Sequence, residues 1–198
     1  MRIFCKLNFL ILIIFVGFSQ LLFAEDNREV PLDMYLIIDG SASFQDVRNE
    51  AVAWLNGHLV DRILMEGDRV TIWLAGETVR EIFSGEIPSG GTSAADTKEE
   101  IKSRILAITG SGRTADFSGA LSELEPRLPR TPENRLAYTV LLTSSAGGLE
   151  RVLTGSSLRM LRWSRSEKYE RWQALVIAPN IGQRVSQAAT AYMNFARR

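Results

Sequence analysis

Cysteine and histidine are almost absent from this sequence, and neither sign of charge is in excess. Its 198 residues include one cysteine, one histidine, 23 basic and 23 acidic side chains. A single cysteine cannot form an intrachain disulfide or the multi-cysteine site of structural zinc. The balanced charge gives no support to nucleic-acid binding, which relies on excess lysine and arginine. With 45% hydrophobic residues, a chain of this length can bury the core of one domain.

Charged residues are scarce in residues 1–24, which contain only Arg2 and Lys6. An almost unbroken apolar run over residues 7–23 follows, and an alanine precedes the first acidic residues. A basic start, an apolar middle and a small residue at the cleavage point are typical of a secretory signal peptide. We therefore expect a cleaved signal peptide, with an uncleaved membrane anchor as the alternative, followed by a single domain over residues 25–198.

Both alternatives place the domain outside the cytoplasm, because the basic end of such a segment stays inside. Loss of residues 1–24 would remove Cys5 and two positive charges, which leaves 21 basic and 23 acidic side chains. A cysteine-free exported domain favours the periplasm or cell envelope, with secretion as a further alternative. We expect no nucleic-acid partner, and membrane contact only through residues 7–23 if they are retained.

Strand-like and helix-like segments alternate along the rest of the chain. Apolar runs predict strands over residues 34–38, 69–75, 136–143 and 172–178, and helical spacing predicts helices over 46–64, 97–108, 117–124 and 183–197. Residues 77–83 can pair back on the second strand. Asp46 and Thr97 are expected to cap helices, and residues 84–95 to form a loop. The alternation predicts an α/β three-layer sandwich, a mostly parallel central sheet flanked by helices.

Asp39, Ser41 and Ser43 follow the first predicted strand at alternate positions. In open α/β sheets, ligands bind beyond the carboxyl ends of the strands. One carboxylate and two hydroxyls are oxygen ligands with a single charge, which suit a hard cation such as Mg²⁺. The sequence therefore indicates a metal site at this end of the sheet.

With these residues, the chain resembles a von Willebrand factor type A domain over about residues 31–196. In that family, Asp-x-Ser-x-Ser after the first strand is the core of the metal-ion-dependent adhesion site (MIDAS). The resemblance implies that Asp39, Ser41 and Ser43 hold Mg²⁺ or Mn²⁺. It implies a further ligand in Thr114, which lies in a glycine-bearing loop before a helix.

One position departs from the family pattern. Ser144 follows the strand of residues 136–143, where the family has a second aspartate. Because a hydroxyl supplies no charge, this difference predicts weaker Mg²⁺ binding. Asp116 is a candidate to compensate for the lost charge, and a metal-free site is the alternative.

The resemblance implies a non-enzymatic binding module for a protein partner, whose Glu or Asp side chain would complete the metal shell. A second hypothesis is a metal-independent scaffold of a cell-envelope assembly, which would use the arginines and aromatics of residues 151–172. Arginine beside aromatic residues is typical of binding hot spots. The candidates there are Arg159, Arg162, Trp163 and Arg165. The alternative for this region is a solvated helix whose arginine stems cover apolar surface.

A serine-dependent hydrolase is a third hypothesis. It requires a base beside the nucleophile, and His58 is the sole histidine. Residue 58 falls in the predicted helix of residues 46–64, away from the strand ends. The sequence therefore favours a binding module over an enzyme.

Overall fold

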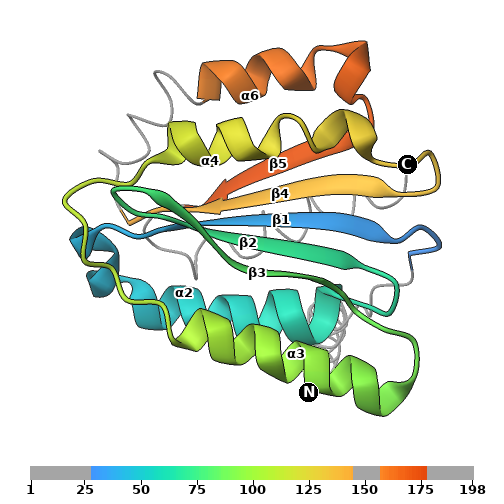
Figure 1. Ribbon diagram of the computed structural model, residues 1–198, viewed down its shortest axis with the longest axis horizontal. Helices are drawn as coiled ribbons and strands as arrows, with labels where there is room; N and C mark the ends of the chain where they lie inside the picture. The colour runs from blue at the N-terminus through green and yellow to red at the C-terminus, as the bar shows by residue number, and fades with distance from the viewer. Residues whose placement is uncertain (1–27, 145–156, 178–198) are drawn as a thin grey trace, which may run out of the picture.

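A five-stranded sheet forms the centre of the computed structural model, which describes residues 28–144 and 157–177 (Figure 1). The strands are β1 (Leu32–Asp39), β2 (Arg69–Ala75), β3 (Val79–Glu86), β4 (Leu136–Leu142) and β5 (Trp172–Ile177). Their order across the sheet is β3-β2-β1-β4-β5. The pairs β1–β2, β1–β4 and β4–β5 are parallel, and β3 pairs antiparallel with β2. The predicted, mostly parallel sheet is confirmed.

Helices cover both faces of the sheet (Figure 1). One face carries α2 (Arg48–Trp54), which continues as the π-helix η2 (Leu55–Ile63), and α3 (Gly91–Leu106). The other face carries α4 (Phe117–Leu124) and α6 (Ser157–Ser164). Short 3₁₀ turns complete the described elements: η1 (Ala42–Asp46), η3 (Leu128–Arg130) and η5 (Glu167–Tyr169). These layers form the expected three-layer sandwich.

The central strand β1 is buried along its whole length because helices lie on both sides of it. Successive side chains of a strand point to opposite faces. Leu36 and Ile38 accordingly pack in the core beneath α2 and α3, whereas Tyr35 and Ile37 pack in the core beneath α4. This explains why the sequence of β1 is continuously apolar instead of alternating.

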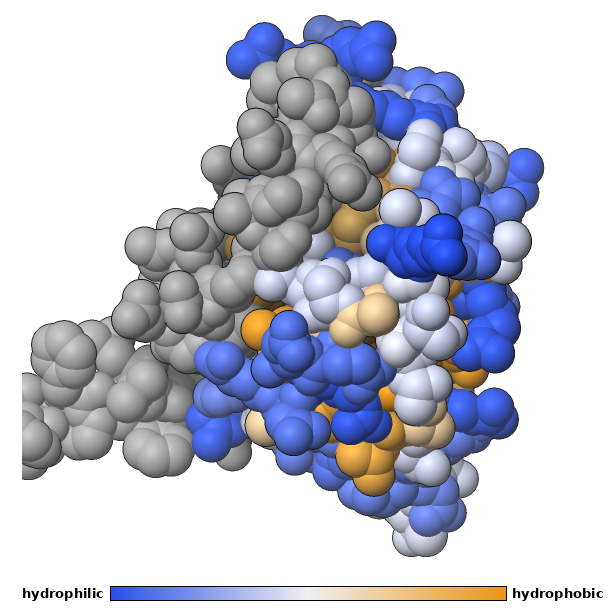
Figure 2. Space-filling view, turned by 90° about the vertical axis from the view of Figure 1, so that its left-hand side faces the viewer, coloured by the Kyte–Doolittle hydropathy of each residue, from blue (hydrophilic) through white to orange (hydrophobic). Residues whose placement is uncertain are grey.

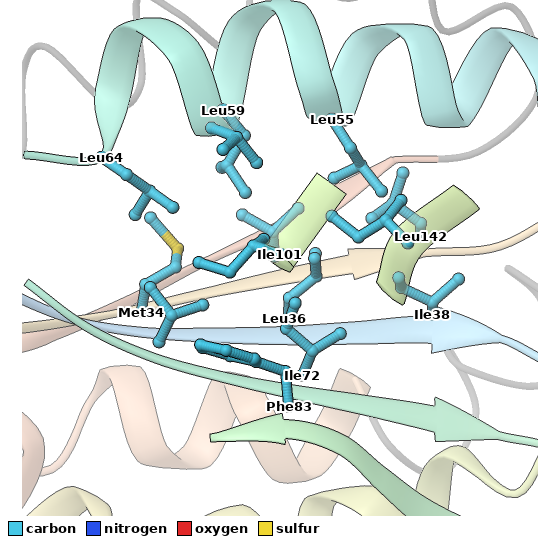
Figure 3. Packing of buried hydrophobic residues seen from close by; sticks show 14 of the residues in the cluster. Met34, Leu36, Ile38, Leu55, Leu59, Leu64, Ile72, Phe83, Ile101 and Leu142 are labelled. Carbon is cyan, nitrogen blue, oxygen red and sulfur yellow. The ribbon is translucent and has the colours of Figure 1, made fainter. Parts of the chain in front are cut away.

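Figure 3 shows the first of these cores. Leu55, Leu59 and Leu64 point from the helical layer toward the sheet, where Leu36 and Ile72 meet them. All five side chains are almost fully buried. Burying a side chain of this kind stabilises the fold by about 1.5–3 kcal/mol relative to leaving it exposed.

The expected helix caps are wrong. Asp46 lies inside η1, and α2 begins at Arg48 without a side-chain cap. The helix α3 begins at Gly91, so Thr97 lies within it and donates from Oγ1 to the Ser93 carbonyl, 3.0 Å away. A threonine inside a helix can donate its hydroxyl hydrogen bond to a backbone carbonyl four residues earlier. Because Thr97 does so, the capping pattern predicted the helix start at the wrong residue.

The loop predicted over residues 84–95 is shorter than expected, because β3 extends to Glu86 and α3 starts at Gly91. The predicted signal peptide and the predicted helix over 183–197 lie outside the described residues. No helix within residues 28–144 and 157–177 combines the length and apolar character needed to cross a bilayer.

Candidate functional site at the carboxyl end of the sheet

The ends of β1 and β4 and the loop of residues 110–116 meet at one end of the sheet. The backbone N–H of Ala42 donates to the carbonyl of Gly112 over 2.8 Å, and Ser41 forms an isolated parallel bridge with Gly112. Ser144, two residues after β4, contacts the end of β1 from the other side. The three segments that the sequence indicated are therefore brought together.

Figure 2 looks directly onto this end of the molecule, which lies at the left in Figure 1. Pale, weakly polar residues lie in the middle of the described surface, next to strongly hydrophilic ones. A surface of small polar residues suits contact with polar groups of a ligand more than burial of apolar ones.

Two glycines allow the backbones to approach closely here. A Cβ on Gly110 would overlap the carbonyl oxygen of Ser41, so no larger residue fits without a backbone shift. A Cβ on Gly40 would lie 3.0 Å from Gly76 Cα, in the turn between β2 and β3. Gly40 N also donates to the carbonyl of Ala75 over 2.8 Å. The site depends on backbone contacts that only glycine permits.

Asp39 is the buried anion of the site, with 2% of its surface exposed. Its Oδ1 accepts from Ser41 N over 2.8 Å. Its Oδ2 accepts from Thr143 Oγ1 at 2.9 Å, Ser144 N at 3.2 Å and Ser144 Oγ at 3.3 Å. A buried carboxylate needs such donors, since without them its charge would be costly to remove from water.

Three serine hydroxyls form a continuous row that ends on this carboxylate. Ser41 Oγ lies 2.9 Å from Ser43 Oγ, and Ser43 Oγ lies 2.8 Å from Ser144 Oγ. A hydroxyl has one proton, and that of Ser144 is directed to Asp39, so Ser43 donates to Ser144 and Ser41 donates to Ser43. Ser41 and Ser144 are buried, whereas Ser43 is exposed and opens the row to solvent.

The row also fits a divalent cation. Adjacent oxygens around octahedral Mg²⁺, at its usual bond lengths, lie about 2.9 Å apart. The two hydroxyl separations, 2.9 and 2.8 Å, are those of ordinary O–H···O hydrogen bonds and are also compatible with this spacing. All the atoms available as metal ligands are oxygens, which a hard cation prefers. The charge is low, because the described residues contain no cluster of three or more His, Cys, Asp or Glu side chains.

The loop of residues 110–116 contributes Thr114 and Asp116. Thr114 is exposed, and its hydroxyl makes no hydrogen bond to the described residues. Asp116 is the N-cap of α4, and its Oδ1 accepts from Gly119 N over 2.8 Å. The cap therefore occupies one carboxylate oxygen of Asp116, the candidate to compensate for the aspartate that the family has at position 144.

Two residues near the site had no clear signal in the sequence. Thr143 is 1% exposed and holds Asp39 by a hydrogen bond from its hydroxyl, whereas the family motif concerns the neighbouring position 144. Glu77 lies in the β2–β3 turn, and its Cγ is 3.2 Å from the place of a Cβ on Gly112. Only the packing of that turn against the loop brings Glu77 to the rim of the site.

The aromatic part of residues 151–172 is internal where the structure describes it. Trp163 is 5% exposed, and its ring centroid lies 5.8 Å from that of Tyr169 and 5.6 Å from that of Trp172. Arg159 lies over the Trp163 ring and pairs with Glu125, and this hydrogen bond lowers the pKa of the Glu125 carboxyl. Trp163 is therefore covered by its own domain.

Arg162 and Arg165 are exposed on the same helix and the turn after it. The structure brings neither of them near the hydroxyl row, because α6 lies over β5 at the far edge of the sheet (Figure 1). His58 also lies apart from the row, in η2, with its ring stacked on Trp54 at 6.5 Å.

Comparisons with known proteins give one distant sequence relative. No protein-family model matches the sequence. The chain is 25% identical over 175 residues to an uncharacterized protein of Treponema pallidum (strain Nichols), a match that covers 82% of this chain and 75% of that protein.

Solved structures resemble the fold more clearly. The manganese-loaded TRAP protein of Plasmodium vivax aligns with a TM-score of 0.55 and 20% identity over 81% of this chain. Proximal thread matrix protein 1 from the mussel byssus, with a zinc-occupied MIDAS motif, aligns with a TM-score of 0.53 and 15% identity over 85% of this chain. This chain spans 63% and 48% of those two proteins, respectively. The described residues therefore have a fold like that of the von Willebrand factor type A domain.

Proposed function

We propose that this protein is a non-enzymatic binding module, which recognises a protein partner at the carboxyl end of its sheet with the help of Mg²⁺ or Mn²⁺. The row of hydroxyls from Ser41 through Ser43 to Ser144 is the observation that carries the proposal. It combines oxygen ligands at suitable spacing, an anion at one end and an exposed member at the other.

Each residue has a distinct part in this proposal. Ser41, Ser43 and Ser144 would hold the cation through their hydroxyl oxygens, and Thr114 would add a ligand from the neighbouring loop. Asp39 would supply the negative charge behind them, fixed in place by its four hydrogen bonds. When bound, the cation would supply a positive charge that accepts a Glu or Asp side chain of the partner.

The similar structures lend support to a cation. One of them is described as manganese-loaded and the other as having a zinc-occupied MIDAS motif. The oxygen-only side chains of Asp39, Ser41, Ser43 and Ser144 support a hard cation in this protein. With one buried carboxylate in place of two, we expect weaker Mg²⁺ binding than a site with two carboxylates would give.

Calorimetric titration of Mg²⁺ and Mn²⁺ into the protein tests this proposal. We expect saturable uptake, and a loss of affinity of at least about tenfold in Ser43→Ala, because an exposed ligand is removed without disturbing the core. Ser103→Ala on the exposed side of α3 is the matched control and should bind as the wild type does. Absence of uptake by the wild type would refute the cation part of the proposal.

Partner recognition is tested by capture from a cell-envelope extract with and without EDTA. We expect the wild type to retain a protein that EDTA releases and that Ser43→Ala fails to retain. Retention that is insensitive to both changes would favour the second candidate, a metal-independent scaffold. The complete set of hydrogen bonds on Asp39 supports that candidate, since this buried charge is satisfied without a cation.

The proposed location is outside the cytoplasm, in the periplasm or cell envelope or as a secreted protein. The basic and apolar pattern of residues 1–24 supports it. Cell fractionation, with N-terminal sequencing of the exported protein, distinguishes a cleaved signal from a retained anchor. Recovery of the intact chain in the cytoplasm would contradict the proposed export.

A further inference from the structure

A cleft lies at the end of the sheet opposite the hydroxyl row. Its volume is about 400 Å³, and it opens between the start of β1 and β2, the end of β3 and the segment after α4. Tyr35 and Thr71 line it from the strands, and Arg69, Arg127 and Arg130 contribute three guanidinium groups. None of these residues belongs to the hydroxyl row at the carboxyl end.

Ring stacking and hydrogen bonds hold the side chains on the strand side of the cleft. The Tyr35 ring stacks on the Trp73 ring at a centroid distance of 5.9 Å and an angle of 10°. The guanidinium of Arg127 lies 4.8 Å from the Trp73 ring centroid and donates to Glu81 Oε2 over 2.9 Å. It also donates to Thr71 Oγ1 at 3.4 Å. Arg127 is therefore held in position before any ligand arrives.

The acidic residues of the cleft already have cationic partners. Asp33 lines the cleft, and its Oδ1 accepts from Nε of Arg135, a buried residue outside the lining, over 2.7 Å. Glu86 pairs with Arg69 at 3.2 Å. Arg130, by contrast, is exposed, and its side chain makes no ion pair or hydrogen bond to the described residues. The cleft therefore has one unneutralised positive charge at its edge.

We propose that this cleft binds a small organic anion, a molecule of sugar-like size that carries a carboxylate or phosphate group. Guanidinium groups bind both groups through paired, charge-assisted hydrogen bonds, and Arg130 is placed to provide them, whereas Arg127 is already paired with Glu81 and shapes the wall of the cleft. The hydroxyls of Tyr35, Thr71 and Ser84 and the carboxylate of Glu86 offer hydrogen bonds to a polar body. The cleft volume is within the usual range of small-molecule sites, about 300–1,000 Å³.

The state of Tyr35 agrees with this assignment. Burial raises the pKa of its hydroxyl to about 12, with a smaller contribution from Asp33. The hydroxyl is protonated at neutral pH, as that of an ordinary tyrosine also is, so it can donate a hydrogen bond to an anion.

The test is a calorimetric titration of the whole chain with inorganic phosphate, glucose 6-phosphate, glucuronate and uncharged glucose. We expect glucose 6-phosphate or glucuronate to bind more tightly than inorganic phosphate and glucose, and the tighter of the two identifies the anionic group. Arg130→Gln should weaken that binding about tenfold, because it removes one charge-assisted contact without breaking an internal ion pair. Tyr35→Phe, which keeps the ring, should weaken it by a smaller factor.

Arg80→Gln is the matched control, since Arg80 is an exposed arginine of β3 outside the cleft lining. It should leave binding unchanged, as should EDTA and Ser43→Ala, so failure of the cation proposal would not affect this result. The proposal is overturned if none of the anions binds, if inorganic phosphate binds as tightly as the organic anions, or if Arg80→Gln weakens binding as much as Arg130→Gln.

Discussion

Thr143 donates a hydrogen bond from Oγ1 to Asp39 Oδ2 over 2.9 Å, although 104 positions separate the two residues in the chain. Both are buried, so the bond holds the end of β4 against the end of β1 away from water. It fixes the carboxylate on which the hydroxyl row ends.

Thr143→Val should lower the free energy of unfolding by about 1–3 kcal/mol, because it leaves a buried carboxylate oxygen with one donor fewer. Urea denaturation measures this change. Thr92→Val, at an exposed position of α3, is the control and should change stability by less than about 0.5 kcal/mol. Equal effects of the two substitutions would contradict the structural importance given to this bond.

Gly110→Ala should destabilise the domain and weaken the site, since the new Cβ would overlap the carbonyl oxygen of Ser41. The required backbone shift is expected to cost about 1–3 kcal/mol, as overpacking does in a core. Gly57→Ala is the opposite case, because no atom lies within 4 Å of its added Cβ. In thermal unfolding we expect Gly57→Ala to be neutral or stabilising and Gly110→Ala to be lower in Tm.

Ser144→Asp should make stability depend strongly on Mg²⁺. Without the cation, a second carboxylate beside Asp39 lowers stability through repulsion of like charges, because the Ser144 hydroxyl lies only 3.3 Å from Asp39 Oδ2. With the cation, binding to the folded state alone adds about 2.7 kcal/mol at a concentration 100 times the Kd. Thermal unfolding with Mg²⁺ or EDTA measures both effects.

The exposed substitution Ser103→Asp is the control for that experiment and should show neither effect. If Ser144→Asp and the wild type respond equally to Mg²⁺, position 144 does not contribute to a cation site.

Asp68→Ala should be one of the most damaging single substitutions. Asp68 and Arg28 form an ion pair at 2.6 Å, with both side chains fully buried. Loss of one partner leaves the other charge buried, which costs about 3–5 kcal/mol. Glu100→Gln, which breaks a half-exposed pair with Arg104, should cost no more than about 1 kcal/mol. Equal changes in the denaturation midpoints of the two variants would contradict the larger loss of stability expected for the buried ion pair.

The pKa of His58 should lie below its ordinary value, chiefly because of burial and secondly because of the nearby charge of Arg62. The folded state therefore binds a proton less readily than the unfolded state, so this group favours folding above the ordinary histidine pKa and loses that contribution as pH falls. As the chain has one histidine, its NMR titration is unambiguous. Arg62→Gln should raise the pKa, and an unchanged value would contradict the charge effect.

The apolar runs of this sequence determine its strands and the layers around them. The expected strand of residues 69–75 matches β2, because a run buried on both faces has few alternatives. The sequence also indicates Asp39, Ser41 and Ser43, since residues at the carboxyl end of a parallel strand face one shared edge. Local capping patterns were less informative, as Thr97 shows, because the same side chains can bond within a helix.

Tertiary structure alone decided what those residues contact. The pairing of Thr143 with Asp39 and the row from Ser41 to Ser144 depend on parallel strands that place residues a hundred positions apart side by side. The burial of Trp163 and the cleft beside Arg130 depend on helix packing in the same way. A sequence pattern gives the spacing of side chains along the chain. Their distances across the sheet, their burial and their charge pairing arise only when the chain folds.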